Sequence, residues 1–166
     1  MRVPPEEIKR RTDRFREVLK RSGVKLTHQR LEIFRVAAGS GDHPDAETIY
    51  KSVRRRIPPI SLDTVYRTLW MLLDLKLIDT LGPRDRIRFD ANTGIHHHFV
   101  CRKCGTTRDF TSEELDGLRV PDAVRDWGAG ESMRLEVRGV CHRCSKEKGP
   151  QEPSHGIAHK KQRRTA

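Results

Sequence analysis

The chain has 166 residues, and its 34 lysines and arginines against 23 aspartates and glutamates give a formal net charge of +11. This length allows one domain or two small ones, and the charge indicates an anionic partner, most commonly nucleic acid. No apolar run approaches the length of a membrane-spanning helix, and the first residues lack a secretory signal pattern, so we expect no membrane partner, a cytoplasmic location and reduced cysteines.

Four amphipathic helices are predicted in the first half of the chain. The spacing of apolar residues places them at 5–21, 27–38, 45–53 and 61–76, the last three capped by Thr27, Asp45 and Ser61. Strand-like alternation then predicts a hairpin of 77–81 and 86–89 around a turn at 82–85. Helices followed by a basic hairpin are typical of a winged helix-turn-helix domain, which we place at residues 1–90.

The helix at 61–76 is the predicted DNA-recognition helix, because the helix before the hairpin enters the major groove in winged helix-turn-helix domains. Its outer face offers Thr64, Tyr66, Arg67 and Thr68, whose hydroxyl and guanidinium groups can bind base edges or phosphates. An ordinary surface role is the alternative for each of these side chains. The complete set of predicted DNA-contacting residues is Lys25, Arg30, Thr64, Tyr66, Arg67 and Arg86.

Beyond residue 90 the composition changes, and a second domain is predicted. Residues 91–94 have the composition of a hinge, and 95–145 alternate as strands at 96–100, 108–110 and 133–140 around a helix at 112–127 that Pro121 interrupts. Residues 146–166 are basic and nearly free of apolar side chains, which predicts a disordered tail. The predicted fold class is therefore α+β, a winged helix joined by a hinge to a small α/β domain.

Two CxxC pairs contain all the cysteines of the chain: Cys101, Cys104, Cys141 and Cys144. Each CxxC turn directs two sulfurs at one centre, and four thiolates complete a closed tetrahedral zinc shell with no position for water. The sequence therefore predicts a structural zinc site. Two disulfides, four buried thiols or a rubredoxin-like iron site are the alternatives.

Several segments together resemble the ferric uptake regulator family, from about residue 10 to Lys146. They are LTHQR (26–30), DHPDAETIY (42–50), SLDTVYRTL (61–69), RFD (88–90), HHHFVCRKCG (96–105) and GVCHRC (139–144). The resemblance implies a transcription repressor that binds inverted-repeat operator DNA as a homodimer when a second, regulatory metal is bound. It also implies that the C-terminal domain forms the dimer.

A second group of possible metal ligands follows the hairpin. His96 and His98 are two apart on a predicted strand, so both imidazoles point to one face, and Asp90 and Asp109 flank them. Imidazole and carboxylate ligands suit Fe²⁺ or Mn²⁺ and leave the sulfurs to zinc. By the resemblance, the family's five regulatory positions are His43, Asp90, His96, His98 and Asp109; the alternative is a loop histidine and ordinary carboxylates at strand ends.

The two aspartates resemble the peroxide-stress branch of the family, whereas iron sensors usually carry glutamates there. In that branch, bound ferrous iron reacts with peroxide and a ligand histidine is oxidised, here His43 or His98. Ile95 and His97 stand where many iron sensors hold an additional metal. A repressor that responds to iron, manganese or zinc without sensing peroxide is the alternative.

Two other classes of protein fit part of the sequence. A zinc hydrolase or deaminase needs an open zinc position and a general base, and the deaminase signature HxE before PCxxC is absent, so we expect neither an enzyme nor a small organic substrate. A zinc-ribbon module that binds another protein would use the cysteines but leave the helices and the His/Asp group unexplained.

Overall fold

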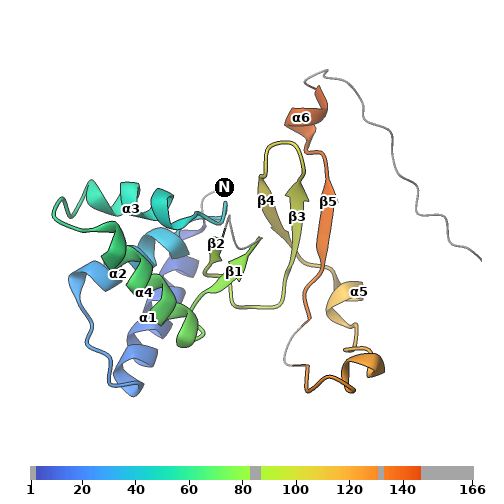
Figure 1. The fold of residues 1–166 in the computed structure, drawn as a ribbon, viewed down its shortest axis with the longest axis horizontal. Coiled ribbons are helices and arrows are strands. Elements are labelled where there is room, and N and C mark those ends of the chain that lie inside the picture. The colour runs from blue at the N-terminus through green and yellow to red at the C-terminus, as the bar shows by residue number, and fades with distance from the viewer. Residues whose placement is uncertain (1–2, 83–86, 131–132, 147–166) are drawn as a thin grey trace, which may run out of the picture.

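Helices and a short hairpin form the N-terminal half of the molecule. The computed structural model describes residues 3–82, 87–130 and 133–146. The helices are α1 (Pro5–Arg21), α2 (His28–Ala38), α3 (Ala46–Arg54) and α4 (Leu62–Asp74), and an antiparallel hairpin pairs β1 (Asp79–Leu81) with β2 (Arg88–Asp90). Figure 1 shows these elements, α1 to β2, gathered on one side of the molecule; we call them the helical lobe.

Capping side chains explain where the helices begin. The hydroxyls of Thr27 and Ser61 and the carboxylate of Asp45 each accept a hydrogen bond from the backbone N–H three residues further on. These bonds satisfy donors that the first turn of α2, α4 and α3 leaves without a helical partner. At the end of α1, Gly23 adopts φ +66°, the left-handed conformation that closes many helices. The predicted helices are confirmed, although α4 ends at Asp74, two residues early.

The apolar faces of the helices and of β2 meet in one core. Phe15 of α1 stacks on Phe34 of α2 with ring centroids 4.6 Å apart, and Leu69 of α4 is buried beside them in the same cluster. Phe89 of β2 is 1% exposed and packs edge-on against Trp70 of α4. Because β2 continues from Phe89 into Asp90, the core fixes the position of that carboxylate.

A three-stranded sheet forms the C-terminal half, which we call the sheet lobe (β3 to α6). The strands β3 (His97–Cys101), β4 (Thr107–Phe110) and β5 (Glu136–Gly139) lie in the order β4-β3-β5. β3 pairs antiparallel with β4 and parallel with β5, and its register sets His98 opposite Asp109. The short helix α6 (His142–Lys146) follows β5. The predicted mixed fold and the three strand positions are confirmed.

The segment between β4 and β5 contains much less helix than predicted. Only α5 (Glu113–Asp116) and a 3-10 turn at Asp122–Val124 form within 112–127. Gly117 ends α5, and Pro121 has no N–H to continue a helical hydrogen-bond ladder. The interruption at Pro121 is therefore confirmed, but the helix on either side of it is limited to these two short pieces.

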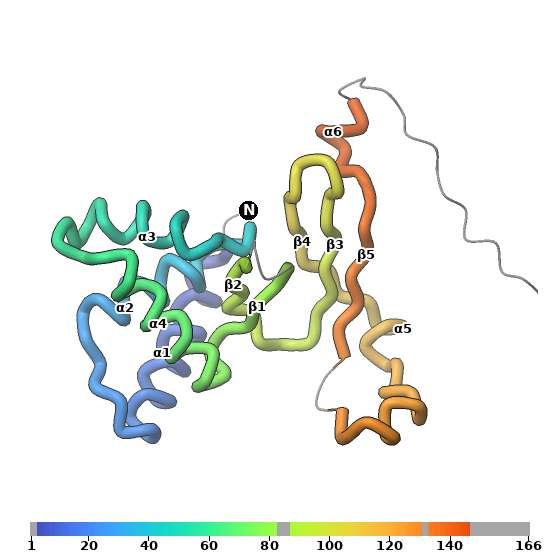
Figure 2. The backbone as a smooth tube through the Cα atoms, in the orientation of Figure 1, coloured from blue at the N-terminus to red at the C-terminus, as the bar shows by residue number. Residues whose placement is uncertain are grey.

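The two lobes lie side by side, and ion pairs join them at positions away from the candidate metal ligands. Figure 2 shows the connection that leads from β2 into β3. Arg108 of β4 pairs with Asp42 at 2.8 Å, and Arg134, just before β5, pairs with Asp79 of β1 at 2.5 Å. In the described part of the chain, no helix is long and apolar enough to span a membrane.

Two predictions fall outside the described residues. They are the hairpin turn with Arg86, within 83–86, and nearly all of the basic tail, 147–166. The predicted boundaries of the domains stay predictions.

Candidate metal centres

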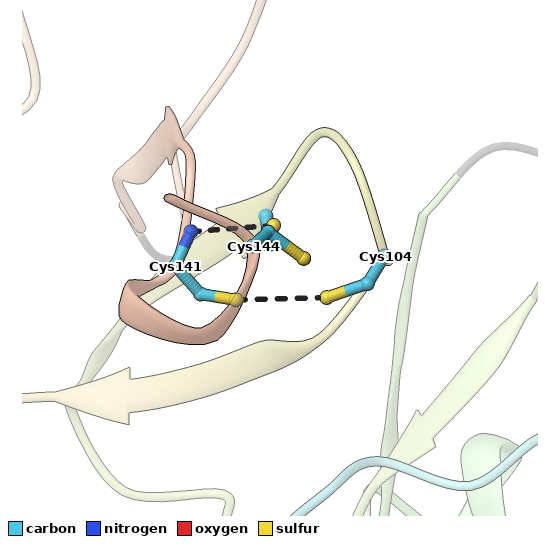
Figure 3. A group of neighbouring side chains, drawn as sticks. Cys104, Cys141 and Cys144 are labelled. Atoms are coloured by element: carbon cyan, nitrogen blue, oxygen red, sulfur yellow. Dashed lines mark hydrogen bonds between the residues drawn. The ribbon is translucent and has the colours of Figure 1, made fainter. Parts of the chain in front are cut away.

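The four cysteines converge at the end of the sheet. Cys101 ends β3, Cys104 lies on the turn that follows, Cys141 directly precedes α6, and Cys144 lies within α6. Their sulfur atoms all lie within 4.8 Å of one another, and none is in a disulfide. Figure 3 shows the sulfurs of Cys104 and Cys141 facing each other, 3.7 Å apart. A tetrahedron with Zn–S bonds of about 2.3 Å has edges of about 3.8 Å, so this spacing fits zinc.

The electrostatics of the cysteine cluster also favour a cation. The hydroxyl of Thr106 lies 3.2 Å from the sulfur of Cys104 and lowers the pKa of that thiol to about 5. The Cys104 sulfur in turn raises the pKa of the Cys144 thiol to about 12. Thiolates so close together repel one another, and a bound divalent cation removes this repulsion.

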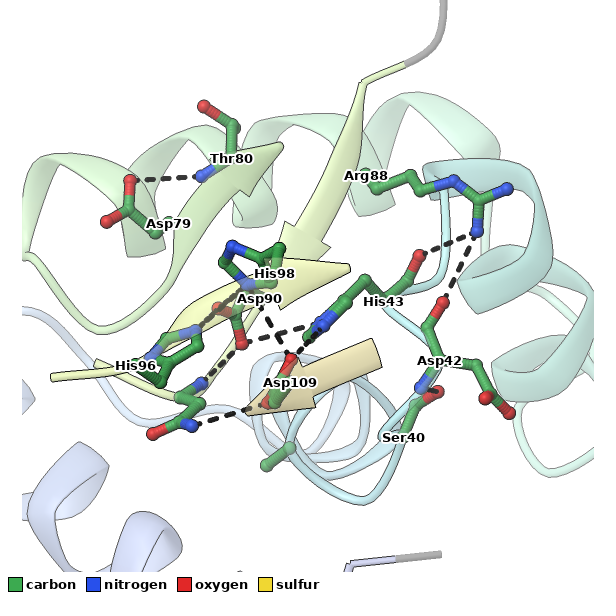
Figure 4. Close-up of polar contacts among 12 residues, drawn as sticks. Ser40, Asp42, His43, Asp79, Thr80, Arg88, Asp90, His96, His98 and Asp109 are labelled. Atoms are coloured by element: carbon green, nitrogen blue, oxygen red, sulfur yellow. Dashed lines mark hydrogen bonds and ion pairs between the residues drawn. The ribbon is translucent and has the colours of Figure 1, made fainter. Parts of the chain in front are cut away.

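The second cluster brings the predicted regulatory residues together from both lobes. His43 comes from the loop after α2, Asp90 ends β2, His96 directly precedes β3, and His98 and Asp109 lie on β3 and β4 of the sheet lobe. His43 Nε2 lies 2.5 Å from Asp109 Oδ1, and His96 Nε2 lies 2.8 Å from Asp90 Oδ2. His98 Nε2 lies between these two pairs, 2.9 Å from His96 Nε2 and 3.6 Å from Asp109 Oδ1. Figure 4 shows all five side chains pointing into one space.

The hydrogen bonding of this cluster is incomplete without a cation. His43, His96 and His98 are each at most 3% exposed, yet the Nδ1 atom of His43 has no hydrogen-bond partner among the described residues and lies 3.5 Å from Asp90 Oδ1. The His96 and His98 nitrogens face each other while both approach the Asp90 carboxylate. Three imidazoles and two carboxylates in one buried space match the ligand preferences of Fe²⁺ and Mn²⁺, so the residues fit a regulatory metal.

Charge interactions hold this cluster in its ionised form. Burial alone would raise the pKa of the Asp90 carboxyl, but hydrogen bonds from His96 and His98 outweigh burial and keep that pKa below its usual range. Burial would likewise raise the pKa of the Asp109 carboxyl, but the hydrogen bond from His43 helps to lower it. Burial opposes charge on His96, but the Asp90 carboxylate raises its pKa. The carboxylates are thus anionic and ready to bind a cation.

His97 lies on the opposite face of β3 and takes no part in either cluster. Its Nδ1 accepts a hydrogen bond from the backbone N–H of Leu135, and its Nε2 lies 3.0 Å from the Asp116 carboxylate of α5. Strand alternation predicted the opposite face for His97. Asp116 was missed, because no sequence signal indicated that α5 would pack beside β3.

The predicted DNA-contacting residues other than Arg86, which lies outside the described residues, are found near the N-terminal ends of α2 and α4. Arg30, Thr64 and Arg67 line one notch of about 320 Å³. Lys25 is exposed before α2, and Tyr66 is 40% exposed on α4. Thr68, predicted on the outer face, is instead buried, because it lies on the same face of α4 as Val65 and Leu72. Its hydroxyl donates to the Thr64 carbonyl within the helix.

Comparisons with known proteins agree with this architecture. The sequence pattern of the ferric uptake regulator family matches residues 21–137. The chain is 36% identical over 131 residues to the peroxide-responsive repressor PerR of Staphylococcus epidermidis, covering 78% of this chain and 87% of that protein. It is also 36% identical over 145 residues to the ferric uptake regulation protein of Bacillus subtilis, covering 83% of this chain and 97% of that protein.

Solved structures give the same picture of the fold. The ferric uptake regulator of Helicobacter pylori, described as having three functional metal binding sites, superimposes with a TM-score of 0.69 and 26% identity over 90% of this chain and 99% of that chain. A zinc-bound manganese uptake regulator superimposes with a TM-score of 0.59 and 33% identity, over 76% and 97% of the two chains.

Proposed function

The chain belongs to the ferric uptake regulator family, and from this premise we propose that it is a metal-dependent transcription repressor that binds inverted-repeat operator DNA as a homodimer. The observation that carries the proposal is the contact of His43, from the helical lobe, with Asp109, from the sheet lobe, inside a buried cluster of potential ligands. A cation held there links the part that reads DNA to the part that forms the dimer.

In this proposal the two clusters have different tasks. The four cysteines hold Zn²⁺ in a closed shell that stabilises the sheet lobe, and the cluster of His43, Asp90, His96, His98 and Asp109 holds exchangeable Fe²⁺ or Mn²⁺. Closing this shell fixes the angle between the lobes and so the spacing of the two recognition helices in a dimer. Lys25, Arg30, Thr64, Tyr66, Arg67 and Arg86 are the proposed DNA contacts.

We further propose that peroxide is the signal. The carboxylate positions are both aspartate, as in the peroxide-stress branch. Among the described residues, groups of three or more potential ligands form only the cysteine cluster and the His/Asp cluster, and His97 is already bonded to Asp116. This arrangement differs from the three metal sites reported for the Helicobacter pylori protein.

Fe²⁺ held by these ligands would supply the redox chemistry that activates peroxide. A neighbouring imidazole, on His43 or His98, gains one oxygen atom at carbon, and the second oxygen of peroxide leaves as water. The altered ring is a poorer ligand, so the lobes lose their link and the repressor releases DNA. The alternative is a repressor that responds to the supply of iron, manganese or zinc, and relatives of both kinds are equally similar at 36% identity.

Mass spectrometry of the iron-loaded protein after brief exposure to peroxide tests this proposal. We expect a gain of one oxygen atom on the peptide with His43 or His98 in the iron form, none in the manganese form, and loss of DNA binding in the iron form alone. The Asp109→Glu variant should keep metal-dependent DNA binding but respond less to peroxide. An unmodified iron form that still releases DNA when iron is withdrawn would support the iron-supply alternative.

A further inference from the structure

His43 has an unfavourable backbone conformation. Its φ is +46°, in the left-handed region that residues with a side chain rarely adopt, and Pro44 follows it. A proline further restricts the conformation of the residue before it. Such a conformation is energetically unfavourable and persists only where surrounding contacts impose it. His43 is nevertheless 1% exposed and reaches across to the sheet lobe.

Strand β2 supplies the contacts that hold this segment. The Nη1 atom of Arg88 donates to the carbonyl oxygens of Asp42 and His43, each at 3.3 Å. The backbone N–H of Phe89 donates to the carbonyl of Pro44 at 3.0 Å. Figure 4 shows the Arg88 guanidinium turned toward the Asp42 and His43 backbone while the His43 ring points away, into the cluster. The next residue of β2 is Asp90, so one short strand places two of the candidate ligands.

We propose that Arg88 is the positioning residue for His43: its guanidinium clamps the strained backbone so that the imidazole can complete the regulatory metal shell. The guanidinium bonds the backbone carbonyl of His43 and not its imidazole, so the clamp acts through the position of His43. This inference rests on the proposed function, because it assigns the residue that sets the affinity of that regulatory site.

The charge of Arg88 acts in the opposite direction to the clamp. Arg88 and Arg102 line the same cavity of about 580 Å³, which His98 also lines. A positive charge near a cation site weakens cation binding, so removal of charge alone should tighten it. Removal of the clamp should weaken binding. A fall in the metal affinity of Arg88→Gln therefore indicates the clamp, and a rise indicates the charge. Arg102→Gln is the matched control, because it removes the same charge from the wall of the same cavity.

The experiment is a Mn²⁺ titration of the zinc-loaded full chain and its Arg88→Gln, Arg88→Lys and Arg102→Gln variants. Because partners that orient a metal ligand commonly change affinity by 10- to 100-fold, we expect about that loss in Arg88→Gln. Arg88→Lys should recover part of it, and Arg102→Gln should bind within about twofold of the wild type or more tightly. Zinc content should be equal in all four proteins. Wild-type affinity in Arg88→Gln would overturn the inference.

Hydrogen exchange of the protein without regulatory metal provides a second readout. Exchange in the peptide spanning 40–49 should be faster in Arg88→Gln than in the wild type and unchanged in Arg102→Gln. If the wild type bound neither Mn²⁺ nor Fe²⁺, the proposed function would fail, and exchange alone would decide the clamp. Equal exchange of this peptide in wild type and Arg88→Gln would then overturn it.

Discussion

At the scale of single residues, the cysteine cluster is a site of concentrated negative charge that needs a cation. The sulfurs of Cys104 and Cys141 lie 3.7 Å apart, and the cluster joins the turn after β3 to α6. We expect Cys101→Ser and Cys144→Ser each to lose zinc and dimerisation together, because three thiolates no longer close the shell. Metal analysis and sedimentation measure both properties.

The control for these variants is Ser145→Ala, next to Cys144. The Ser145 hydroxyl bonds only a carbonyl of its own helix turn among the contacts described, at His142. This variant should keep one zinc per protomer and remain dimeric. A folded, dimeric Cys101→Ser protein without zinc would show that the metal is not structural.

Glu32 is the most buried carboxylate of the helices. It is 5% exposed and accepts hydrogen bonds from Arg35 and Arg56, both at 2.9 Å. Burial raises its pKa, but the two arginines outweigh burial and lower it below 4.5. A lowered pKa means that the ionised form stabilises the fold above pH 4.5, and that this contribution is lost as the pH falls through the pKa of the folded state.

We therefore expect Glu32→Gln to lower the free energy of unfolding by roughly 1–3 kcal/mol at pH 7. The deficit should shrink below pH 4.5, where the wild-type carboxylate also becomes neutral. Urea unfolding at several pH values measures it. Glu17→Gln, which breaks an exposed pair with Arg21, is the control and should change stability by less than about 1 kcal/mol. A deficit that grows with acid would contradict the assignment.

Individual metal ligands were predictable where both the residue types and their spacing in the sequence indicate a metal site. The CxxC pairs and the alternation of His96 and His98 along a strand locate ligands without a structure. The partners that orient them were not predictable: Arg88 acts on His43 from 45 positions away, and Asp116 meets His97 only because α5 folds back beside β3. Ordinary charged residues acquire such roles through the path of the chain.

At the scale of elements, α4 combines a buried face with the proposed DNA-reading face. Val65, Leu69 and Leu72 are 0% exposed, while Tyr66 and Arg67 face outward. Arg67 pairs with Asp63 one turn earlier at 2.9 Å, a surface ion pair that is easily exchanged for a nucleic-acid contact.

We expect Arg67→Ala to weaken operator binding by about 1–3 kcal/mol while binding to unrelated DNA changes less. Fluorescence anisotropy with an operator selected from random DNA measures the ratio. Arg125→Ala, which removes a similar exposed pair with Asp122 in the sheet lobe, is the control and should bind as the wild type does. If Arg67→Ala and Tyr66→Ala both kept full operator affinity, α4 would be the wrong helix.

Elements were predictable where local signals define both ends. Thr27, Asp45 and Ser61 mark helix starts by their own side-chain hydrogen bonds, so the helical lobe could be predicted closely. The segment 112–127 has no comparable pair of signals. The parallel pairing of β5 with β3 was also unpredictable, since β4 and 30 further residues separate the two strands and only tertiary packing decides their neighbours.

At the scale of the whole molecule, the contacts between the two lobes determine the angle between them. The ion pairs Arg108–Asp42 and Arg134–Asp79 cross between the lobes but are partly exposed, and such pairs contribute roughly 0.2–1 kcal/mol each. A metal ion bound by ligands from both lobes contributes far more, and only while it is present. In the proposed function, the cluster around His43 is therefore the part of the molecule that would switch the relative orientation of the lobes.

Native mass spectrometry of the zinc-loaded protein at increasing Mn²⁺ tests this central claim most directly. The account predicts a dimer that holds one zinc per protomer from the cysteines and takes up one further Mn²⁺ per protomer. It also predicts that His43→Ala, which removes the only proposed ligand from the loop after α2, keeps its zinc but loses the Mn²⁺ at the same concentration. A wild-type dimer that takes up no Mn²⁺, or a His43→Ala dimer that takes it up as readily, would contradict the account.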